Sequence, residues 1–238
     1  PIAECFGNSQ KWFSGVVVTD GAGSPRSGLY ADFTDEQMRT VRIAEQKKAA
    51  HVGEYGFQLM LRHTSESVKD AKNKLIVEEL AEIIKAAKPK ILYTHNLADK
   101  HDTHVATALK VIEALRTLKK QERPEKVYGC EVWRDLDWMC DEEKIFMDCG
   151  SHPNLMRGLS AVFDSQIEGG KRYDMAVEGR RLANATFSAS HACDTYRALN
   201  YAMDLTPLMD ENTDIVDYIT GYIERFKETV GQMIGKYI

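Results

Sequence analysis

Short apolar segments that alternate with longer segments of helical periodicity constrain the fold of this chain more than any other feature. The short runs are typical of buried parallel strands and lie at residues 13–19, 57–61, 90–95 and 126–132. Segments with apolar residues at helical spacing follow them, at residues 34–52, 66–87 and 104–119. This order predicts an α/β fold in which helices cover both faces of a parallel sheet.

Residues typical of helix ends flank the segment at residues 34–52, and further helices are expected in the last third of the chain. Thr34 and Gln37 are placed as an N-cap and first turn, and Gly53 is placed as the stop. Beyond residue 141 we expect mostly helix, most clearly at residues 172–187 and 213–236. No repeat, low-complexity stretch or linker interrupts the pattern, so we expect residues 1–238 to form a single domain.

Charge and cysteine content narrow the class of protein. The net charge of −5 argues against a general nucleic-acid binder, and no apolar run reaches the ~18 residues that a membrane span needs. The five cysteines are scattered without a Cys-x-x-Cys pair, which indicates reduced thiols rather than a disulfide framework or a cysteine zinc knuckle. These features predict a soluble cytoplasmic protein. They are compatible with a homo-oligomer.

The densest polar cluster lies between an apolar strand and the helix that follows it. Within ten residues it contains three histidines and two aspartates: His95, Asp99, His101, Asp102 and His104. The carboxyl end of a strand is where open α/β sheets place their ligands. With the helix beginning near Asp102, His104 lies in its first turn and His101 just outside it.

Two chemical interpretations of this cluster are open. Neutral imidazole is the commonest zinc ligand, and a neighbouring carboxylate fixes its tautomer. The alternative is a solvated loop with a polar helix cap. Residues of one loop do not close a catalytic zinc site, because such a site takes three protein ligands and a water molecule.

Two further motifs lie earlier in the chain. Asp20-Gly21 begins a glycine-containing turn after the first strand, but a dinucleotide fingerprint would need glycine where Arg26 stands. Arg42 and Glu45 are three residues apart on the next helix, where the simplest interpretation is a solvated ion pair.

Taken together, these motifs resemble the LmbE/PIG-L family of N-deacetylases. Residues 94–104 resemble the second metal motif of that family, and residues 16–21 resemble its strand that ends in Thr-Asp-Gly. Residues 42–53 are similar to its R-x-x-E-x-x-x-A helix, and residues 163–166 are similar to its Ser-Gln element. The resemblance runs from about residue 13 to residue 166.

The resemblance implies a Rossmann-like, three-layer fold with a mostly parallel sheet, and a hydrolase that removes acetyl groups from amino sugars or related small molecules. It implies a cofactor, zinc or another divalent metal, with His104 as a ligand. His101 would polarise the amide carbonyl and stabilise the oxyanion. The family has an aspartate where Thr103 stands, so Asp102 or Asp99 would have to orient His101.

The resemblance also implies residues that contact the N-acetylated substrate, and we assign this role to Asp20, Gly21, Arg42 and Asn96. Further metal ligands and the catalytic base belong, in the family, to an early His-Pro-Asp-Asp-type loop, which this sequence does not contain. The chain begins at Pro1, in a segment that is typical of the end of a helix. We therefore expect an upstream strand and loop that carry these groups, or else a degenerate copy of the enzyme.

Two other classes of function remain as alternatives. A non-catalytic binding or scaffold domain would keep the fold without a complete metal site. A metal phosphoesterase is indicated by the adjacent His101 and Asp102, but it would require a second set of such residues, and none is found.

Overall fold

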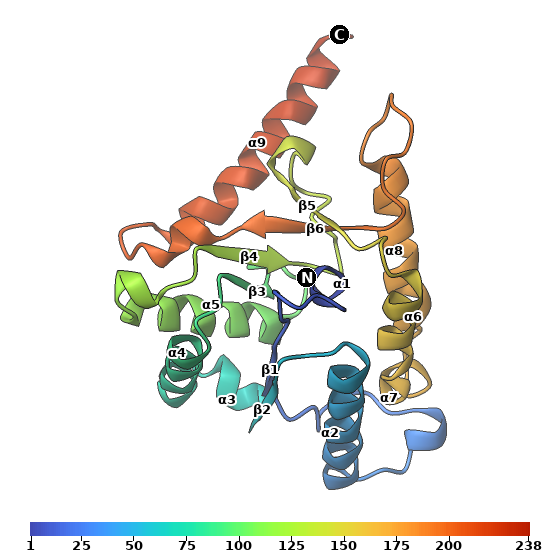
Figure 1. The fold of residues 1–238 in the computed structure, drawn as a ribbon. Helices are drawn as coiled ribbons and strands as arrows, with labels where there is room; N and C mark the ends of the chain where they lie inside the picture. Colours follow the sequence, from blue (N-terminus) through green and yellow to red (C-terminus); the bar gives the residue numbers. More distant parts are fainter. The chain divides into compact units, whose positions relative to one another are not determined.

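The structure, a computed structural model, describes residues 1–238 and has a mixed α/β fold (Figure 1). The chain forms two compact units, one of residues 1–67 and 147–200 and the other of residues 68–146 and 201–238. The α/β class is therefore confirmed. The single domain expected for residues 1–238 stays a prediction.

The first unit contains a two-stranded sheet and several helices, which come from both of its chain segments. Its elements are α1 (Ile2–Cys5), β1 (Gly15–Thr19), the 3-10 turn η1 (Gly28–Tyr30), α2 (Asp35–Val52), β2 (Gln58–His63), α6 (Pro153–Ala161), α7 (Asp164–Ile167) and α8 (Tyr173–Phe187). β1 and β2 run parallel, with Val16 opposite Leu59. The Thr34 side chain caps α2 and forms a reciprocal capping box with Gln37, as the sequence predicts.

The second unit contains most of the larger sheet, which has strand order β3-β4-β6-β5 (Figure 1). Its elements are α4 (Leu75–Ala87), β3 (Ile91–His95), α5 (Asp102–Thr117), η2 (Lys120–Glu122), β4 (Lys126–Cys130), η3 (Asp141–Glu143), η4 (Thr206–Met209) and α9 (Ile215–Gly235). Three elements cross a division between the units: α3 (Ser65–Lys69), β5 (Ile145–Asp148) and β6 (Leu199–Asp204). α4 packs against α5, and α5 packs against β3.

The core of the second unit forms where α4 and α5 meet the sheet. Its fully buried side chains include Ile76, Ile112, Leu115, Val127, Met203, Leu205 and Leu208. At its centre Gly129 of β4 permits a close approach, because a Cβ atom there would lie 2.7 Å from Leu205 Cδ1. The loop after β3 rests on this core, so its backbone has a rigid base.

One expectation about the elements is wrong, and another is incomplete. The single helix expected at residues 66–87 is two helices, because the side chains of Asp70 and Asn73 accept hydrogen bonds from the backbone two residues ahead and form a turn between α3 and α4. The chain beyond residue 141 is largely helical, as expected, with α8 and α9 at the two clearest segments, but it also contains β5 and β6.

β6, which the sequence pattern does not predict, changes the character of the sheet. β3 and β4 are parallel, but β6 pairs with β4 in antiparallel orientation, with Gly129 opposite Met203. The larger sheet is therefore mixed, and a mostly parallel sheet is not confirmed. β6 has the sequence LNYAMD, which carries no β-branched residue, so its strand character comes from pairing with β4.

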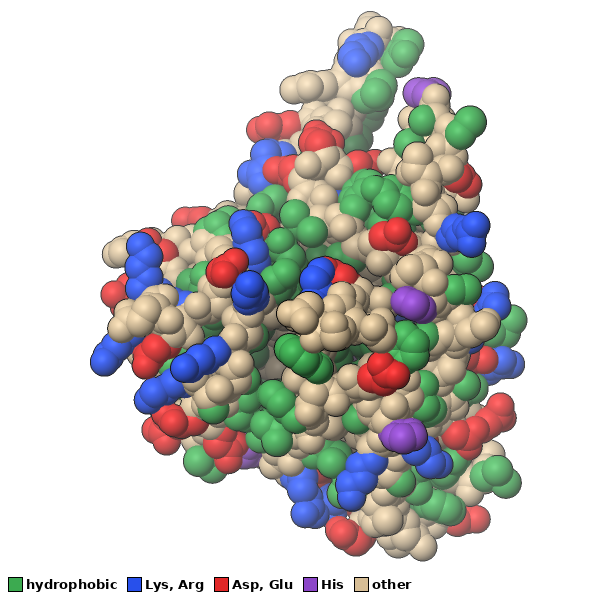
Figure 2. Space-filling view, viewed as in Figure 1, with side chains coloured by type: hydrophobic (Ala, Val, Ile, Leu, Met, Phe, Trp, Pro, Cys, Tyr) green, Lys and Arg blue, Asp and Glu red, His purple; other side chains and the backbone are tan.

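None of the helices has both the length and the apolar character needed to cross a membrane. On the face drawn in Figure 2, acidic and basic side chains are interspersed.

Candidate active site

The polar cluster lies in the turn that joins β3 to α5, within the second unit. Asn96 starts this turn: it is fully buried, its Oδ1 atom accepts a hydrogen bond from the Ala98 N–H, and its Nδ2 atom contacts Met203 Sδ at 3.3 Å. These contacts shape the loop. The predicted substrate-contacting residue Asn96 therefore lies beneath the surface of the site.

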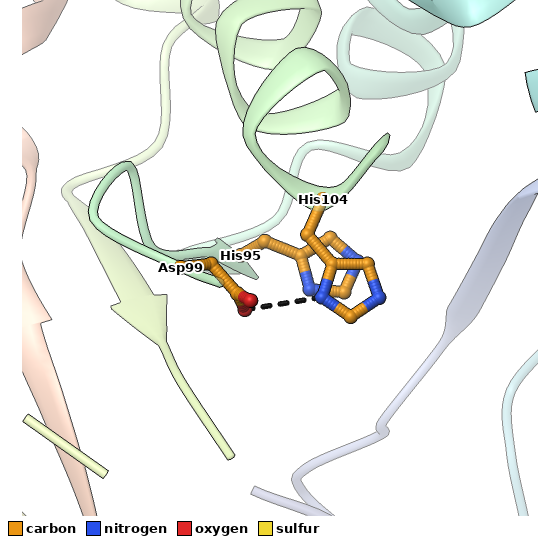
Figure 3. A group of neighbouring side chains, drawn as sticks. All are labelled: His95, Asp99 and His104. Carbon is orange, nitrogen blue, oxygen red and sulfur yellow. Dashed lines mark hydrogen bonds and ion pairs between the residues drawn. The ribbon is translucent and has the colours of Figure 1, made fainter. Parts of the chain in front are cut away.

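The Asp99 carboxylate joins both ends of the turn. Its side chain is only 1% exposed. Oδ1 accepts a hydrogen bond from the His101 N–H at 2.9 Å, and Oδ2 lies 3.0 Å from Nδ1 of His104 (Figure 3). A carboxylate at Nδ1 favours the tautomer with its proton on that atom, which leaves the lone pair on Nε2 of His104 available.

Three imidazole rings stand side by side at this end of β3. The His95 and His104 rings are stacked, with centroids 4.0 Å apart and planes 3° from parallel. The His101 ring centroid lies 4.9 Å from that of the His104 ring. Sequence position alone predicts His104 in the first turn of α5 and His101 just outside it; the structure confirms both, with His101 as the N-cap residue.

A donor group suited to a metal ion is present. One ligand atom from each of His95, Asp99 and His104 lies within 4.8 Å of the others. Burial lowers the pKa of His95 to about 4, helped by the nearby His104 and His101, so its ring is neutral at pH 7. Two imidazoles and a carboxylate are donor groups that zinc accepts. The residues therefore fit a zinc ion.

The sequence left open whether Asp99 or Asp102 orients His101. The structure gives these two aspartates different contacts. Asp102 is 72% exposed, and its carboxylate pairs with Lys69 at 3.2 Å and accepts a hydrogen bond from the Thr103 N–H. Its pKa is lowered, first by the hydrogen bond from Lys69. Asp99 contacts the ring of His104 and only the backbone of His101. Neither carboxylate contacts the His101 ring.

Three other residues near the cluster received no catalytic, metal-binding or substrate-binding role from the sequence. His95 is the last residue of β3, and its position at the strand end is the signal that points to it. Glu131 and Trp133 follow the end of β4, whose Cys130 pairs with His95 in the sheet. Because parallel strands end at the same edge, these residues come beside the histidine turn.

The remaining predicted residues form a cluster of their own in the first unit, at the end of β1. Asp20 accepts a hydrogen bond from the Ala22 N–H and pairs with Arg39 at 2.8 Å. Gly21 adopts a φ of +72°, and a Cβ atom there would lie 3.0 Å from Cγ of Arg42. The turn after β1 therefore packs directly on Arg42.

The Arg42 guanidinium is half-buried, and its Nε atom is buried without a hydrogen-bond partner. Burial lowers the pKa of Arg42, and the nearby Glu45 carboxylate counteracts this effect. The solvated Arg42–Glu45 ion pair that the sequence favours is not found, because Glu45 is buried and bonded elsewhere. Its two carboxylate oxygens each accept a hydrogen bond from Ser165, one from N–H and one from Oγ–H, both at 2.7 Å.

The comparisons with known proteins agree with the motifs. Residues 6–115 match the family described as PIG-L, GlcNAc-PI de-N-acetylase. This match supports the resemblance to the LmbE/PIG-L family that the motifs predict. No curated protein sequence matches it.

Solved structures share the fold at low sequence identity. A conserved protein of Thermus thermophilus, TT1542, matches with a TM-score of 0.64 and 14% identity, over 86% of this chain and 85% of that one. An N,N'-diacetylchitobiose deacetylase from Pyrococcus horikoshii matches with a TM-score of 0.59 and 14% identity, over 87% of this chain and 78% of that one. GalB, a 4-carboxy-2-hydroxymuconate hydratase from Pseudomonas putida KT2440, matches with a TM-score of 0.59 and 13% identity, over 86% of this chain and 100% of that one. The fold thus serves more than one reaction.

Proposed function

We propose that this protein is a zinc-dependent hydrolase that removes an N-acetyl or similar N-acyl group from an amino sugar or a related small molecule. The observation that carries the proposal is the pairing of Asp99 with His104 beside His101 at the end of β3. The family description and the deacetylase of Pyrococcus horikoshii support the choice of reaction. The cytoplasmic location predicted from the cysteines belongs to the same proposal.

In this proposal His104 would hold the metal, and His95 and Asp99, whose ligand atoms lie within 4.8 Å of that of His104, would be available to join it. Zinc, or another divalent metal in its place, would supply a Lewis acid that polarises the amide carbonyl and activates a water molecule. Asp99 has the further role of holding the His104 ring in one orientation and one tautomer. Asp102 pairs with Lys69, so we assign it no direct part in the reaction.

His101 is the group we assign to the developing oxyanion. Its ring lies next to the His104 ring, with centroids 4.9 Å apart, so it faces the same reacting centre as the metal ligand. A hydrogen-bond donor placed at a developing negative charge stabilises the transition state more than the ground state. The resemblance assigns the catalytic base and further metal ligands to an early His-Pro-Asp-Asp-type loop, which does not occur in residues 1–238.

Substrate binding is assigned to the turn after β1 in the first unit. Arg42 carries a half-buried positive charge whose Nε atom has no hydrogen-bond partner, and such a group is costly unless a ligand or water satisfies it. Asp20 and Gly21 shape the turn that covers it. Sugar hydroxyls are suitable acceptors for this guanidinium.

The test is acetate release by the full-length protein from N-acetylglucosamine derivatives, measured with and without prior chelation of metal. The proposal predicts activity that is lost on chelation and restored by zinc. An inactive zinc-loaded protein that still binds these sugars would support the non-catalytic binding domain instead. The His101→Ala/His104→Ala double variant controls for contaminating enzymes.

A further inference from the structure

The His101 ring has no hydrogen bond that fixes its orientation. Its backbone N–H donates to Asp99, but the ring itself makes only aromatic contacts. One neighbour is the His104 ring, and the other is Trp133, whose ring centroid lies 5.6 Å from that of His101 with a tilt of 36°. The imidazole therefore contacts two other rings.

Trp133 reaches this position from a different strand. It lies three residues after Cys130, which pairs with His95 at the end of the parallel strands β3 and β4. Arg134 then ties the two turns together, since its Nη1 atom donates a hydrogen bond to the Ala98 carbonyl at 2.7 Å. The turn after β4 is thus attached to the turn that carries the histidines.

A buried carboxylate anchors the turn that carries Trp133. The Glu131 side chain is fully buried, and its Oε2 atom accepts hydrogen bonds from Trp138 Nε1 at 3.1 Å and from the Leu136 N–H at 3.4 Å. Asp135 and Leu136 adopt φ values of +54° and +60°, which are uncommon for residues other than glycine. Such a conformation persists where its surroundings hold it, and Leu136 is completely buried.

Trp133 differs from an ordinary core tryptophan. It is only half-buried, and Lys100 Nζ lies 5.9 Å from the centre of its ring. Both Lys100 and His101 belong to the histidine turn, so two of the neighbours of Trp133 are residues of the candidate active site. A side chain that only filled space in the core would not need this position.

We propose that Trp133 is a positioning residue for His101: it fixes the orientation of the imidazole that faces the substrate carbonyl. The expected effect on kcat rests on the proposed function. The expected effect on the orientation of the His101 ring does not. Because misplacement of a catalytic group by about 1 Å costs roughly 10²-fold in rate, loss of Trp133 should lower kcat by about 10- to 100-fold. KM and zinc content should change little, since Trp133 lies against the ring of His101, which is not one of the candidate metal ligands.

The kinetic arm compares Trp133→Ala, Trp133→Phe, His101→Ala and the Trp133→Ala/His101→Ala double variant of the full-length protein, loaded with zinc. We expect Trp133→Phe to retain most of kcat, because a phenyl ring keeps a face against His101. We expect the double variant to be no slower than His101→Ala, since the two residues act through one group. Trp12→Ala, at a 69% exposed position in the first unit, is the matched control and should not change kcat.

Two kinetic outcomes would overturn the proposal. A raised KM with unchanged kcat would make Trp133 a substrate-binding residue, and independent losses in the double variant would separate it from His101. Trp133→Phe keeps the test valid if Trp133→Ala fails to fold.

A spectroscopic arm is independent of activity. NMR spectra of protein with ¹³C-labelled histidine should show one ring-current-shifted His101 signal in the wild type and in Trp133→Phe. The signal should broaden or move toward its random-coil position in Trp133→Ala. If the wild type proves to have no deacetylase activity, the proposed function fails while this arm still decides the positioning role; an unchanged His101 signal in Trp133→Ala would reject it.

Discussion

Oδ2 of Asp99 lies 3.0 Å from Nδ1 of His104, and the same carboxylate accepts the His101 N–H through its other oxygen. One buried side chain therefore sets both the ring of the candidate metal ligand and the backbone from which His101 projects. The arrangement leaves Nε2 of His104 as the atom available to a metal.

Asp99→Asn should lower zinc affinity by about 10- to 100-fold, the usual cost of losing the carboxylate that orients a metal-binding histidine. The measurement is competition with a chromophoric chelator. Asp102→Asn is the control, because Asp102 is exposed and faces Lys69. Equal affinity in Asp99→Asn and wild type would contradict the orienting role, and complete loss of zinc would instead make Asp99 a direct ligand.

His104→Ala should abolish stoichiometric zinc binding, because it removes the imidazole whose second nitrogen is free for the metal. Metal content of purified variants provides the measurement. His51→Ala, at an exposed position of α2, controls for the loss of any histidine. His95→Ala separates the two descriptions of the site: zinc is retained if His95 only stacks on His104, and lost if it is a ligand.

His101→Ala should lower kcat by about 10²-fold or more while zinc content stays near that of the wild type. The reason is that the His101 ring stacks on the His104 ring and forms no hydrogen bond with His104, the candidate metal ligand. Steady-state kinetics on an N-acetylated amino sugar measure the effect. An unchanged kcat would remove His101 from the mechanism.

Glu45→Ala should destabilise the protein by about 1–3 kcal/mol, because it leaves two buried donors of Ser165 without an acceptor. Urea unfolding gives the free energy. Ser165→Ala removes only the hydroxyl bond, so its effect should be smaller, and the double variant should show strong coupling between the two positions. Additive effects would indicate that the two residues stabilise the protein independently.

Glu131→Gln should become more stable relative to the wild type as pH rises. Burial raises the pKa of Glu131, the nearby Asp99 charge adds to this, and hydrogen bonds from Trp138 and Leu136 oppose it. The folded state therefore binds the Glu131 proton more tightly than the unfolded state does. Between the unfolded pKa of about 4.3 and the raised folded pKa, the wild type loses stability as pH increases, and the loss is then constant.

Urea unfolding of both proteins from about pH 4 to pH 8 measures this difference. Glutamine at position 131 retains a carbonyl oxygen that can replace Oε2 as the acceptor of both hydrogen bonds. The exposed Glu125→Gln variant controls for the change in net charge. A difference in unfolding free energy that stays constant over the range would show that Glu131 does not hold its proton more tightly in the fold.

The sequence by itself determined the features that depend on neighbouring residues. Thr34 and Gln37 form their capping box, and the cluster lies between β3 and α5 with His104 in the first turn. These outcomes follow from side-chain and backbone preferences over three or four residues, which little else in the chain can alter. The motifs also predicted the resemblance to the family whose model matches residues 6–115.

Only the tertiary structure decided which groups meet. Asp102 is nearer than Asp99 to His101 and His104 in sequence, but in the structure Asp99 is buried against His104 and Asp102 pairs with Lys69. The antiparallel pairing of β6 with β4 joins residues that are far apart in the chain, such as Gly129 and Met203. Trp133 likewise reaches His101 because two parallel strands end together. Such contacts depend on long-range pairing and packing, which local sequence preference does not specify.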